Sequence, residues 1–198
     1  MAKIHFWYDF ASTYSYPTAM RIEALSKAQG VQVAWRPFLL GPIFADQNWM
    51  SSPFNIFPAK GRYMWRDLER VCGRYGLAFQ RPDPFPQNSL LAARVALALS
   101  EERRPAFTRA VFHAEFAEGK AIGDPDCICS ILTAIGENAA EVMTTIKTEP
   151  HRGQLRLATE TARALGVFGA PSFTTPSGEL FWGDDRLEQA LDWTVDQG

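Results

Sequence analysis

The first forty residues carry the pattern that most restricts the fold, which is two strands separated by one helix. Apolar side chains fill every second position from 4 to 10, with aromatic residues on both faces, as in a central β-strand. A helix is predicted from Pro17, which is tolerated in a first helical turn, to Gly30. The strand-like alternation of side chains between two faces returns at 31–35. Two strands joined by one helix in so short a stretch predict a right-handed unit with parallel strands.

The middle of the chain changes to a helical pattern. Between about residues 40 and 60, Pro, Gly, Asn and aromatic residues interrupt both the helical and the strand pattern of apolar residues, so we expect a long functional loop or lid there. Residues 61–150 carry apolar side chains at spacings of three and four, first between Met64 and Tyr75, and four more helices fit behind that one. The sequence therefore predicts a large helical block.

The last fifty residues return to a strand pattern. A helix over 155–165 precedes two short β-prone runs, 172–175 and 180–182, and the turn signal between them predicts a hairpin before a final helix. The order βαβ, helices, αββα predicts an α/β chain, a thioredoxin-like βαβ…ββα domain with a large all-helical insertion. We expect residues 1–40 and 151–198 to form the thioredoxin-like domain and residues 41–150 the loop plus helical insertion.

Charge and hydropathy exclude several classes of function. The 198 residues include 20 Lys+Arg and 22 Asp+Glu, so the net charge is −2 and no basic surface for phosphate groups is expected. Every apolar stretch is interrupted well short of the roughly 18 residues that span a bilayer. We expect no nucleic-acid partner and no membrane partner. No signal-peptide pattern is apparent at the start, which predicts a cytoplasmic protein.

The cysteines predict neither disulfides nor metal binding. Cys72, Cys127 and Cys129 are odd in number and too few for a disulfide framework, so reduced thiols are expected. Cys127 and Cys129 are two positions apart on a predicted helix and point to different faces. The three histidines show no ligand spacing either. No metal site is therefore predicted.

Chemistry is expected where the first helix begins, at residues 12–15. A helix N-terminus presents unpaired backbone N–H groups and a partial positive charge, which favour a thiolate or another anion. Redox proteins of this fold place a Cys-x-x-Cys pair there, but this chain has Ser12 and Ser15 at the two sulfur positions. Disulfide exchange needs an attacking sulfur, so it is excluded at this place.

Four segments together resemble the 2-hydroxychromene-2-carboxylate isomerase family, in the group shared with kappa-class glutathione transferases and the DsbA-like thioredoxin branch. They are residues 9–16, 58–64, 169–173 and 182–187, and the resemblance extends over essentially the whole chain. It implies a glutathione-dependent cis-trans isomerase that acts on an aromatic-derived carboxylate, as in aromatic catabolism. It also implies a homodimer.

The resemblance assigns roles to individual residues. Ser12 matches the serine that faces the glutathione sulfur, and its alternative role is an ordinary helix N-cap. Ala170 and Pro171 match a cis-proline turn in which the residue before proline offers its backbone to glutathione, the alternative being a trans turn. Lys60 matches a lysine that pairs with a glutathione carboxylate, where the alternative is a solvated surface lysine. Relatives usually carry proline where this chain has Thr13.

Two acidic residues are expected at the other end of glutathione. Asp184 and Asp185 fit a pair at the start of the last helix that holds the γ-glutamyl group. Asp185 would pair with the ammonium group of the ligand. The Asp184 carboxylate would repel the ligand carboxylate, so Asp184 is expected to cap the helix and to bind through its backbone.

An apolar pocket for the second substrate is predicted near the sulfur, with Asn55 as its polar member. Its candidate lining residues are Trp7, Tyr14, Phe38, Trp49, Phe54, Asn55 and Phe57.

Two other functions stay open on the sequence. A kappa-class-like glutathione transferase would use the same thiolate but would retain the conjugate. A redox-inactive thioredoxin-like binding module would hold a peptide in the same groove. Lys60, Asp184 and Asp185 argue against this last possibility, because a peptide groove has no need of opposite charges at fixed ends.

Overall fold

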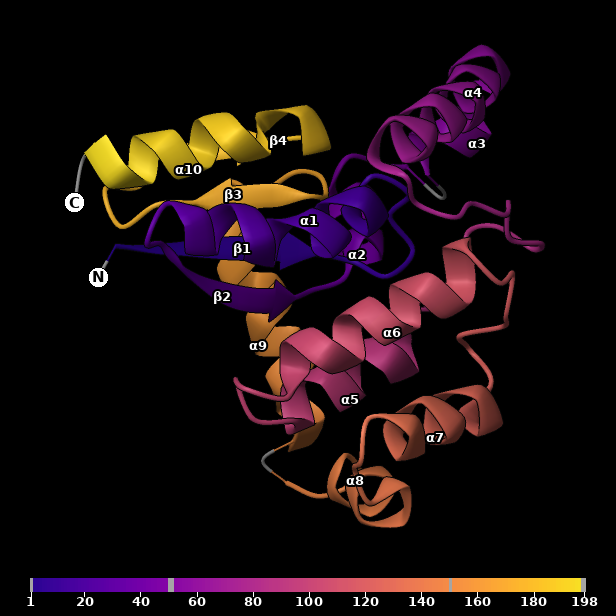
Figure 1. Ribbon diagram of the computed structural model, residues 1–198. Coiled ribbons are helices and arrows are strands. Elements are labelled where there is room, and N and C mark those ends of the chain that lie inside the picture. Colours follow the sequence, from indigo (N-terminus) through magenta and orange to yellow (C-terminus); the bar gives the residue numbers. More distant parts are fainter. Residues whose placement is uncertain (1, 50–51, 150, 197–198) are drawn as a thin grey trace.

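The two ends of the chain meet in one four-stranded sheet (Figure 1). A computed structural model describes residues 2–49, 52–149 and 151–196. In the sheet, β1 (Lys3–Tyr8) pairs in parallel with β2 (Gln32–Pro37) and antiparallel with β3 (Ser172–Thr174). β3 continues antiparallel to β4 (Leu180–Trp182), which gives the order β2-β1-β3-β4. The predicted strands, their parallel unit and the hairpin are confirmed.

Helices from both ends of the chain cover this sheet. α1 (Ser15–Ala28) connects the two parallel strands and contacts α10 (Leu187–Asp196), which follows a single 3-10 turn, η1 (Asp184–Arg186). α9 (His151–Ala164) passes behind the sheet in Figure 1 and contacts β2. This is the thioredoxin-like arrangement that the sequence predicts.

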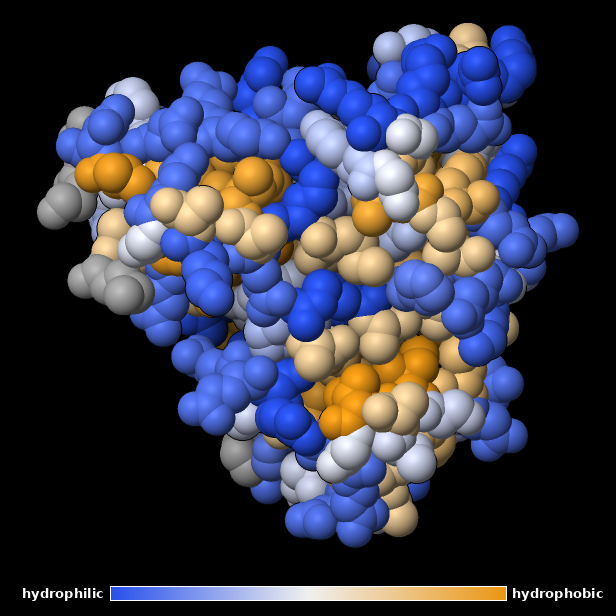
Figure 2. Space-filling model, in the orientation of Figure 1, coloured by the Kyte–Doolittle hydropathy of each residue, from blue (hydrophilic) through white to orange (hydrophobic). Residues whose placement is uncertain are grey.

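The helical block holds four helices behind α4, as predicted. α4 (Pro58–Tyr75) buries Met64, Leu68 and Cys72, and Figure 2 shows hydrophilic side chains over its outer face. The other helices are α5 (Leu90–Ala98), α6 (Arg104–Phe116), α7 (Pro125–Ala134) and α8 (Ala139–Thr145). No helix within the described ranges is long and apolar enough to cross a membrane. The division into two domains stays a prediction.

Two predictions about this block need correction. Residues 40–60 are not one irregular loop, because they contain α2 (Leu40–Asp46) and α3 (Pro53–Ile56), and α4 already begins at residue 58. Proline at the first position of α3 and of α4 is compatible with helix, since that N–H has no helical partner in any case. Residues 77–89 are not helical. Prolines at 82, 84 and 86 remove N–H donors there and restrict the residues before them.

Aromatic residues at the end of β1 and just after it pack directly on the helical block. The Tyr8 hydroxyl lies 2.7 Å from the Thr108 hydroxyl on α6, and the Phe10 and Phe112 ring centroids are 5.0 Å apart. A single buried cluster therefore runs from the sheet into the helical block. The helical block and the sheet share one hydrophobic core.

A buried arginine also fixes the helical block to the sheet. Arg104 is 8% exposed, and its guanidinium donates to the carbonyls of Ala96 at 2.7 Å and Leu99 at 3.2 Å, where α5 ends. The same group donates to the Trp35 carbonyl of β2 at 3.1 Å. It thus satisfies carbonyls that a helix end leaves without partners.

Candidate active site

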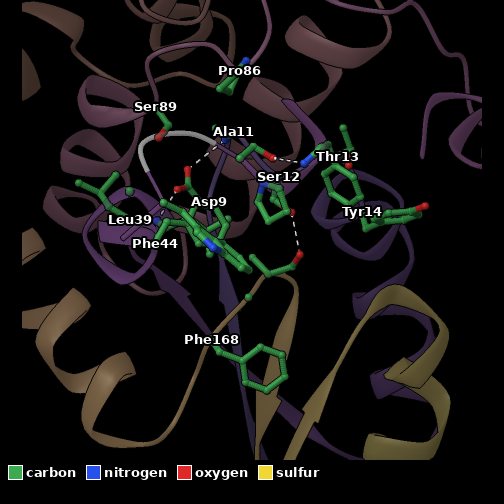
Figure 3. A pocket seen from close by; sticks show the side chains of 18 of the residues that line it. Asp9, Ala11, Ser12, Thr13, Tyr14, Leu39, Phe44, Pro86, Ser89 and Phe168 are labelled. Carbon is green, nitrogen blue, oxygen red and sulfur yellow. Dashed lines mark hydrogen bonds between the residues drawn. The ribbon is translucent and has the colours of Figure 1, made fainter. Parts of the chain in front are cut away.

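A cavity of about 880 Å³ opens beyond the end of β1. Its floor is the turn from Asp9 to Tyr14, and its walls come from Lys60 and from residues within 39–49, 52–54, 85–90, 168–170 and 182–183. Figure 3 shows Phe44, Tyr14 and Phe168 arranged around Ser12. Segments from both ends of the chain and from the helical block therefore build one site.

Ser12 lies on the floor of this cavity. It is 7% exposed, and its hydroxyl donates a hydrogen bond of 2.8 Å to the Ala170 carbonyl (Figure 3). α1 begins at Ser15 with Tyr14 as the N-cap residue, and no side chain in the described part of the chain caps it. The N-cap alternative for Ser12 is therefore wrong. Its hydroxyl faces the proline loop instead.

The loop opposite Ser12 has the predicted cis-proline turn. The Ala170–Pro171 peptide bond is cis, which confirms that expectation, and Ala170 lines the cavity. The Pro171 carbonyl accepts the Gly183 N–H at 2.9 Å, which ties the loop to the end of β4. A side chain at Gly169 would collide with the indole nitrogen of Trp182. A glycine is thus needed where the indole of Trp182 packs on this loop.

Lys60 lies in the cavity wall near the start of α4. Its ammonium group is 4.8 Å from the centre of the Phe57 ring, a distance typical of a cation–π contact. Gly61 follows it, and a Cβ there would collide with the Phe54 carbonyl of α3. The close approach of α3 and α4 therefore fixes the backbone that carries Lys60.

The two acidic residues of η1 have different environments. Asp184 is 6% exposed, and its carboxylate accepts hydrogen bonds from Thr18 at 2.7 Å and from Arg21 at 2.9 Å. Burial raises the pKa of Asp184, although Arg21 opposes the shift. The expected helix cap is wrong, because the N-cap residue of η1 is Gly183 and, among the described residues, no side chain caps it. Asp184 instead connects η1 to α1.

Asp185 remains available at the rim of the cavity. Its side chain is 75% exposed and lies 3.4 Å from the Arg186 guanidinium. One carboxylate oxygen occupies the space that a Cβ of Gly183 would need, and Gly183 lines the cavity. The structure therefore places the Asp185 carboxylate beside the cavity.

The predicted apolar lining is correct in part. Tyr14, Trp49 and Phe54 line the cavity. Trp7 and Phe38 do not, because both are buried in a core cluster beneath the sheet. Asn55 of α3 and Phe57, which follows α3, are exposed and lie outside the described lining, so the role of Asn55 stays a prediction.

Sequence reasoning missed several lining residues, most of them aromatic. They are Leu39, Phe44, Phe85, Phe168 and Trp182. Phe44 lies on α2, within the segment predicted to be irregular, and Phe85 lies among prolines. Large apolar residues in Pro-rich segments are the signal that could have identified these lining residues, because ligand pockets are lined mainly by apolar and aromatic side chains.

Asp9 was also missed as part of the site. It is 3% exposed and lines the cavity, and its carboxylate accepts the N–H groups of Ala11 at 3.0 Å and Leu40 at 2.8 Å. Ser89 provides a further hydrogen bond, while burial raises the pKa of Asp9. Asp9 thus holds the turn that carries Ser12 against the starts of α2 and α5.

Behind Asp9 lies a second buried acid that the sequence did not indicate. Glu115 of α6 is 0% exposed, and neither carboxylate oxygen has a hydrogen-bond partner among the residues that the structure describes. Burial, and secondarily the charge of Asp9, raises the pKa of Glu115 well above its usual value. Glu115 therefore holds its proton at pH values at which an exposed glutamate has lost it.

Glu115→Gln should make the protein more stable relative to wild type as the pH rises. Because the pKa of Glu115 is higher in the folded than in the unfolded state, the wild-type protein loses stability above the unfolded pKa, up to the folded pKa. Glutamine does not titrate, so the free energy of unfolding of the variant minus that of wild type should grow by up to about 1.4 kcal/mol per pH unit above roughly pH 4.3. Urea unfolding at pH 5, 6, 7 and 8 measures it. Exposed Glu118, changed to Gln, is the control, and equal pH profiles for both variants would contradict the prediction.

The cysteines lie outside this chemistry. All three are free, and burial raises the pKa of Cys72 to about 12. Cys127 and Cys129 lie on α7. In the described ranges, no group of His, Cys, Asp and Glu side chains could hold a metal ion.

Comparisons with known proteins agree with this architecture. The family model of the DSBA-like thioredoxin domain matches residues 3–193. The 2-hydroxychromene-2-carboxylate isomerase of Sphingobium xenophagum is 26% identical, with 98% of each chain covered. Glutathione S-transferase kappa 1 of Homo sapiens is 25% identical, over 93% of this chain and 87% of that one. The resemblance inferred from the four segments is confirmed.

A solved structure also shares the fold. The structure of a 2-hydroxychromene-2-carboxylate isomerase superposes with a TM-score of 0.87 at 22% identity, covering 98% of this chain and 97% of the other.

Proposed function

Since the chain belongs to the DSBA-like thioredoxin domain family, we propose that its cavity binds glutathione and that the bound thiolate isomerises a conjugated carbonyl compound. The observation that carries the proposal is the Ser12 hydroxyl, buried against the proline loop at the floor of a large apolar cavity. A hydroxyl cannot exchange disulfides, but it can donate a hydrogen bond to a thiolate. The names of the isomerase and transferase relatives support the same choice.

Three groups around the cavity match the parts of glutathione. The Ala170 backbone would pair with the cysteinyl residue, and Lys60 would pair with the glycine carboxylate. Asp185 would pair with the γ-glutamyl ammonium, and backbone N–H groups at the start of η1 would take the adjacent carboxylate. Each of these positions lines the cavity or borders it.

Glutathione binding would free the Ser12 hydroxyl to donate a hydrogen bond to the sulfur. That hydroxyl has one proton to donate, and in the free protein it donates it to the Ala170 carbonyl at 2.8 Å. A cysteinyl N–H of glutathione would satisfy this carbonyl. Ser12 could then rotate toward the sulfur and donate to the thiolate, which lowers the pKa of the thiol.

The reaction needs no oxidant and no protein sulfur. The thiolate adds to the β-carbon of the conjugated carbonyl, a C–S bond forms, and the π electrons move to the carbonyl oxygen as an enolate. The former double bond rotates as a single bond. The enolate then re-forms the double bond and expels the thiolate, so glutathione is regenerated.

A kappa-class-like transferase is the second candidate, favoured by the similarity to the human protein. It would use the same site and thiolate, but the conjugate would leave as product. Product analysis by mass spectrometry separates the two activities. The aromatic carboxylate substrate, the homodimer and the cytoplasmic location stay predictions.

Glutathione binding should depend on both ends of the site. Lys60→Ala and Asp185→Ala should each weaken binding by roughly 1.5–3 kcal/mol, because each removes a charge-assisted contact. Calorimetry with glutathione measures this, with exposed Lys147→Ala and Asp196→Ala as controls for the change of net charge.

Cysteinylglycine, which lacks the γ-glutamyl group, makes the test specific. Asp185→Ala should hardly affect its binding, since the partner of Asp185 is absent, whereas Lys60→Ala should still weaken it. Equal losses for both thiols would show that Asp185 is structural. A protein that binds neither thiol would be better explained as a redox-inactive binding module.

A further inference from the structure

The cavity is larger and more apolar than a thiol site alone requires. At about 880 Å³ it lies near the upper end of the range of roughly 300–1,000 Å³ for small-molecule sites, which leaves room for a second ligand. The groups assigned to glutathione lie at the proline loop, the end of β4 and the start of α4. The remaining wall, formed by α2, the residues near α3 and residues 85–90, presents Phe44, Trp49, Phe54 and Phe85.

Positive charge is scarce in this cavity. Lys60 is the only Lys or Arg of its described lining, and Asp9 is the only Asp or Glu. The six residues outside the described ranges are Met, Ser, Pro, Gln or Gly, so none can add a basic side chain. Arg163, near α2, is engaged by Asp46 at 2.7 Å.

This distribution of charge matters for the second ligand. If Lys60 holds the glycine carboxylate of glutathione, no cation remains for a carboxylate of the second substrate. Asp9 would repel such a group or, when protonated, would leave it unpaired. A carboxylate that loses its water against aromatic rings without a cationic partner is strongly disfavoured.

We therefore propose that the substrate isomerised here is an uncharged, aryl-substituted enone or enal that lacks a carboxylate. The proposal rests on the proposed glutathione site and narrows its substrate class. The aromatic wall binds the ring of the substrate. A neutral carbonyl needs only a hydrogen-bond donor, and Asn88 in the lining can supply its amide N–H₂, because its amide oxygen already accepts the Leu90 N–H at 3.0 Å.

A pair of saturated ligands that cannot react with thiols tests the proposal by binding alone. 4-Phenylbutan-2-one and 4-phenyl-2-oxobutanoate share the phenyl ring, chain and ketone, but the second carries a carboxylate in place of a methyl group. Calorimetry is run on protein saturated with S-methylglutathione. The ketone should bind more tightly than the oxo acid by on the order of tenfold. Equal or tighter binding of the oxo acid, or binding of neither ligand, overturns the proposal.

An added positive charge should reverse the preference. Gln47→Lys places an ammonium group in the lining and should improve oxo-acid binding on the order of tenfold, with little gain for the ketone. Ala45→Lys is the matched control, because Ala45 is exposed on α2, two residues before Gln47, but lies outside the described lining; it should change binding of neither ligand. Equal effects of the two lysines on the oxo acid would count against the proposal.

The experiment distinguishes a wrong substrate class from a wrong glutathione function. If S-methylglutathione does not bind, the glutathione function fails, and the same pair is then titrated into free Lys60→Ala protein, where the ketone should still be preferred. If the oxo acid is preferred while S-methylglutathione binds, the function stands. The carboxylated substrate class that the resemblance implies is then the correct one.

Discussion

Ser12→Ala should lower the turnover number of the glutathione-dependent reaction on the order of a hundredfold, the usual cost of removing one donor to a reacting anion. Glutathione binding should change by less than about threefold, because the proposed complex assigns the peptide contacts to Ala170, Lys60 and Asp185 rather than to the hydroxyl. Steady-state kinetics at saturating glutathione and calorimetry measure the two effects separately.

Ser15→Ala is the matched control for this prediction. Ser15 is 0% exposed, lies in the first turn of α1 and has no hydrogen-bond partner for its hydroxyl in the described ranges. Its removal should leave turnover close to wild type. An unchanged turnover number in Ser12→Ala would remove Ser12 from the mechanism, and equal losses in both variants would indicate damage to the turn.

Arg104→Met should destabilise the fold by roughly 3–5 kcal/mol, since each buried carbonyl left without a donor costs about 1–3 kcal/mol. The guanidinium serves carbonyls at the end of α5 and on β2, and methionine can fill the space but cannot donate. Denaturant unfolding followed by circular dichroism measures the loss. The melting temperature should fall by about 2–4 °C per kcal/mol.

The neighbouring arginine provides the control. Arg103 has a half-exposed side chain that pairs with Glu137, so Arg103→Met should cost about 1 kcal/mol or less. Equal losses for the two variants would show that the buried carbonyls around Arg104 are satisfied in another way.

The sheet could be predicted because the strands are marked in the sequence by alternating side chains or by turn residues next to them. β1 alternates with aromatic residues on both faces, and the hairpin has a four-residue turn signal between two short strands. α2 and α3 could not be predicted because they have seven and four residues, too short to show a helical period. α3 depends on proline at its start and on contacts with α4, whereas α2 packs on α9.

The parts of the site that depend on the backbone could be predicted from the sequence. The parts that depend on which side chains form hydrogen bonds with one another were predicted less well. Ser12 and the proline loop follow from the start of α1 and the cis turn. Asp184 and Asp185 are adjacent and chemically identical, yet Arg21 and Thr18 engage only the first. Trp7 and Trp49 are likewise indistinguishable by residue type. Only the packing shows that one is core and the other lines the cavity.

The hydrogen bond between Ser12 and Ala170 has a consequence for the order in which the protein becomes functional during synthesis. It joins residues 158 positions apart, and β1 gains its β3 neighbour only after the helical block has been made. Contacts of such long separation form late, because a long loop must close first. A nascent chain that ends within the helical block has a helix start and a serine but no opposing loop. The cavity around Ser12 is therefore complete only after residues 168–183 have been made, so a ligand that needs the whole cavity cannot stabilise a nascent chain that ends before them.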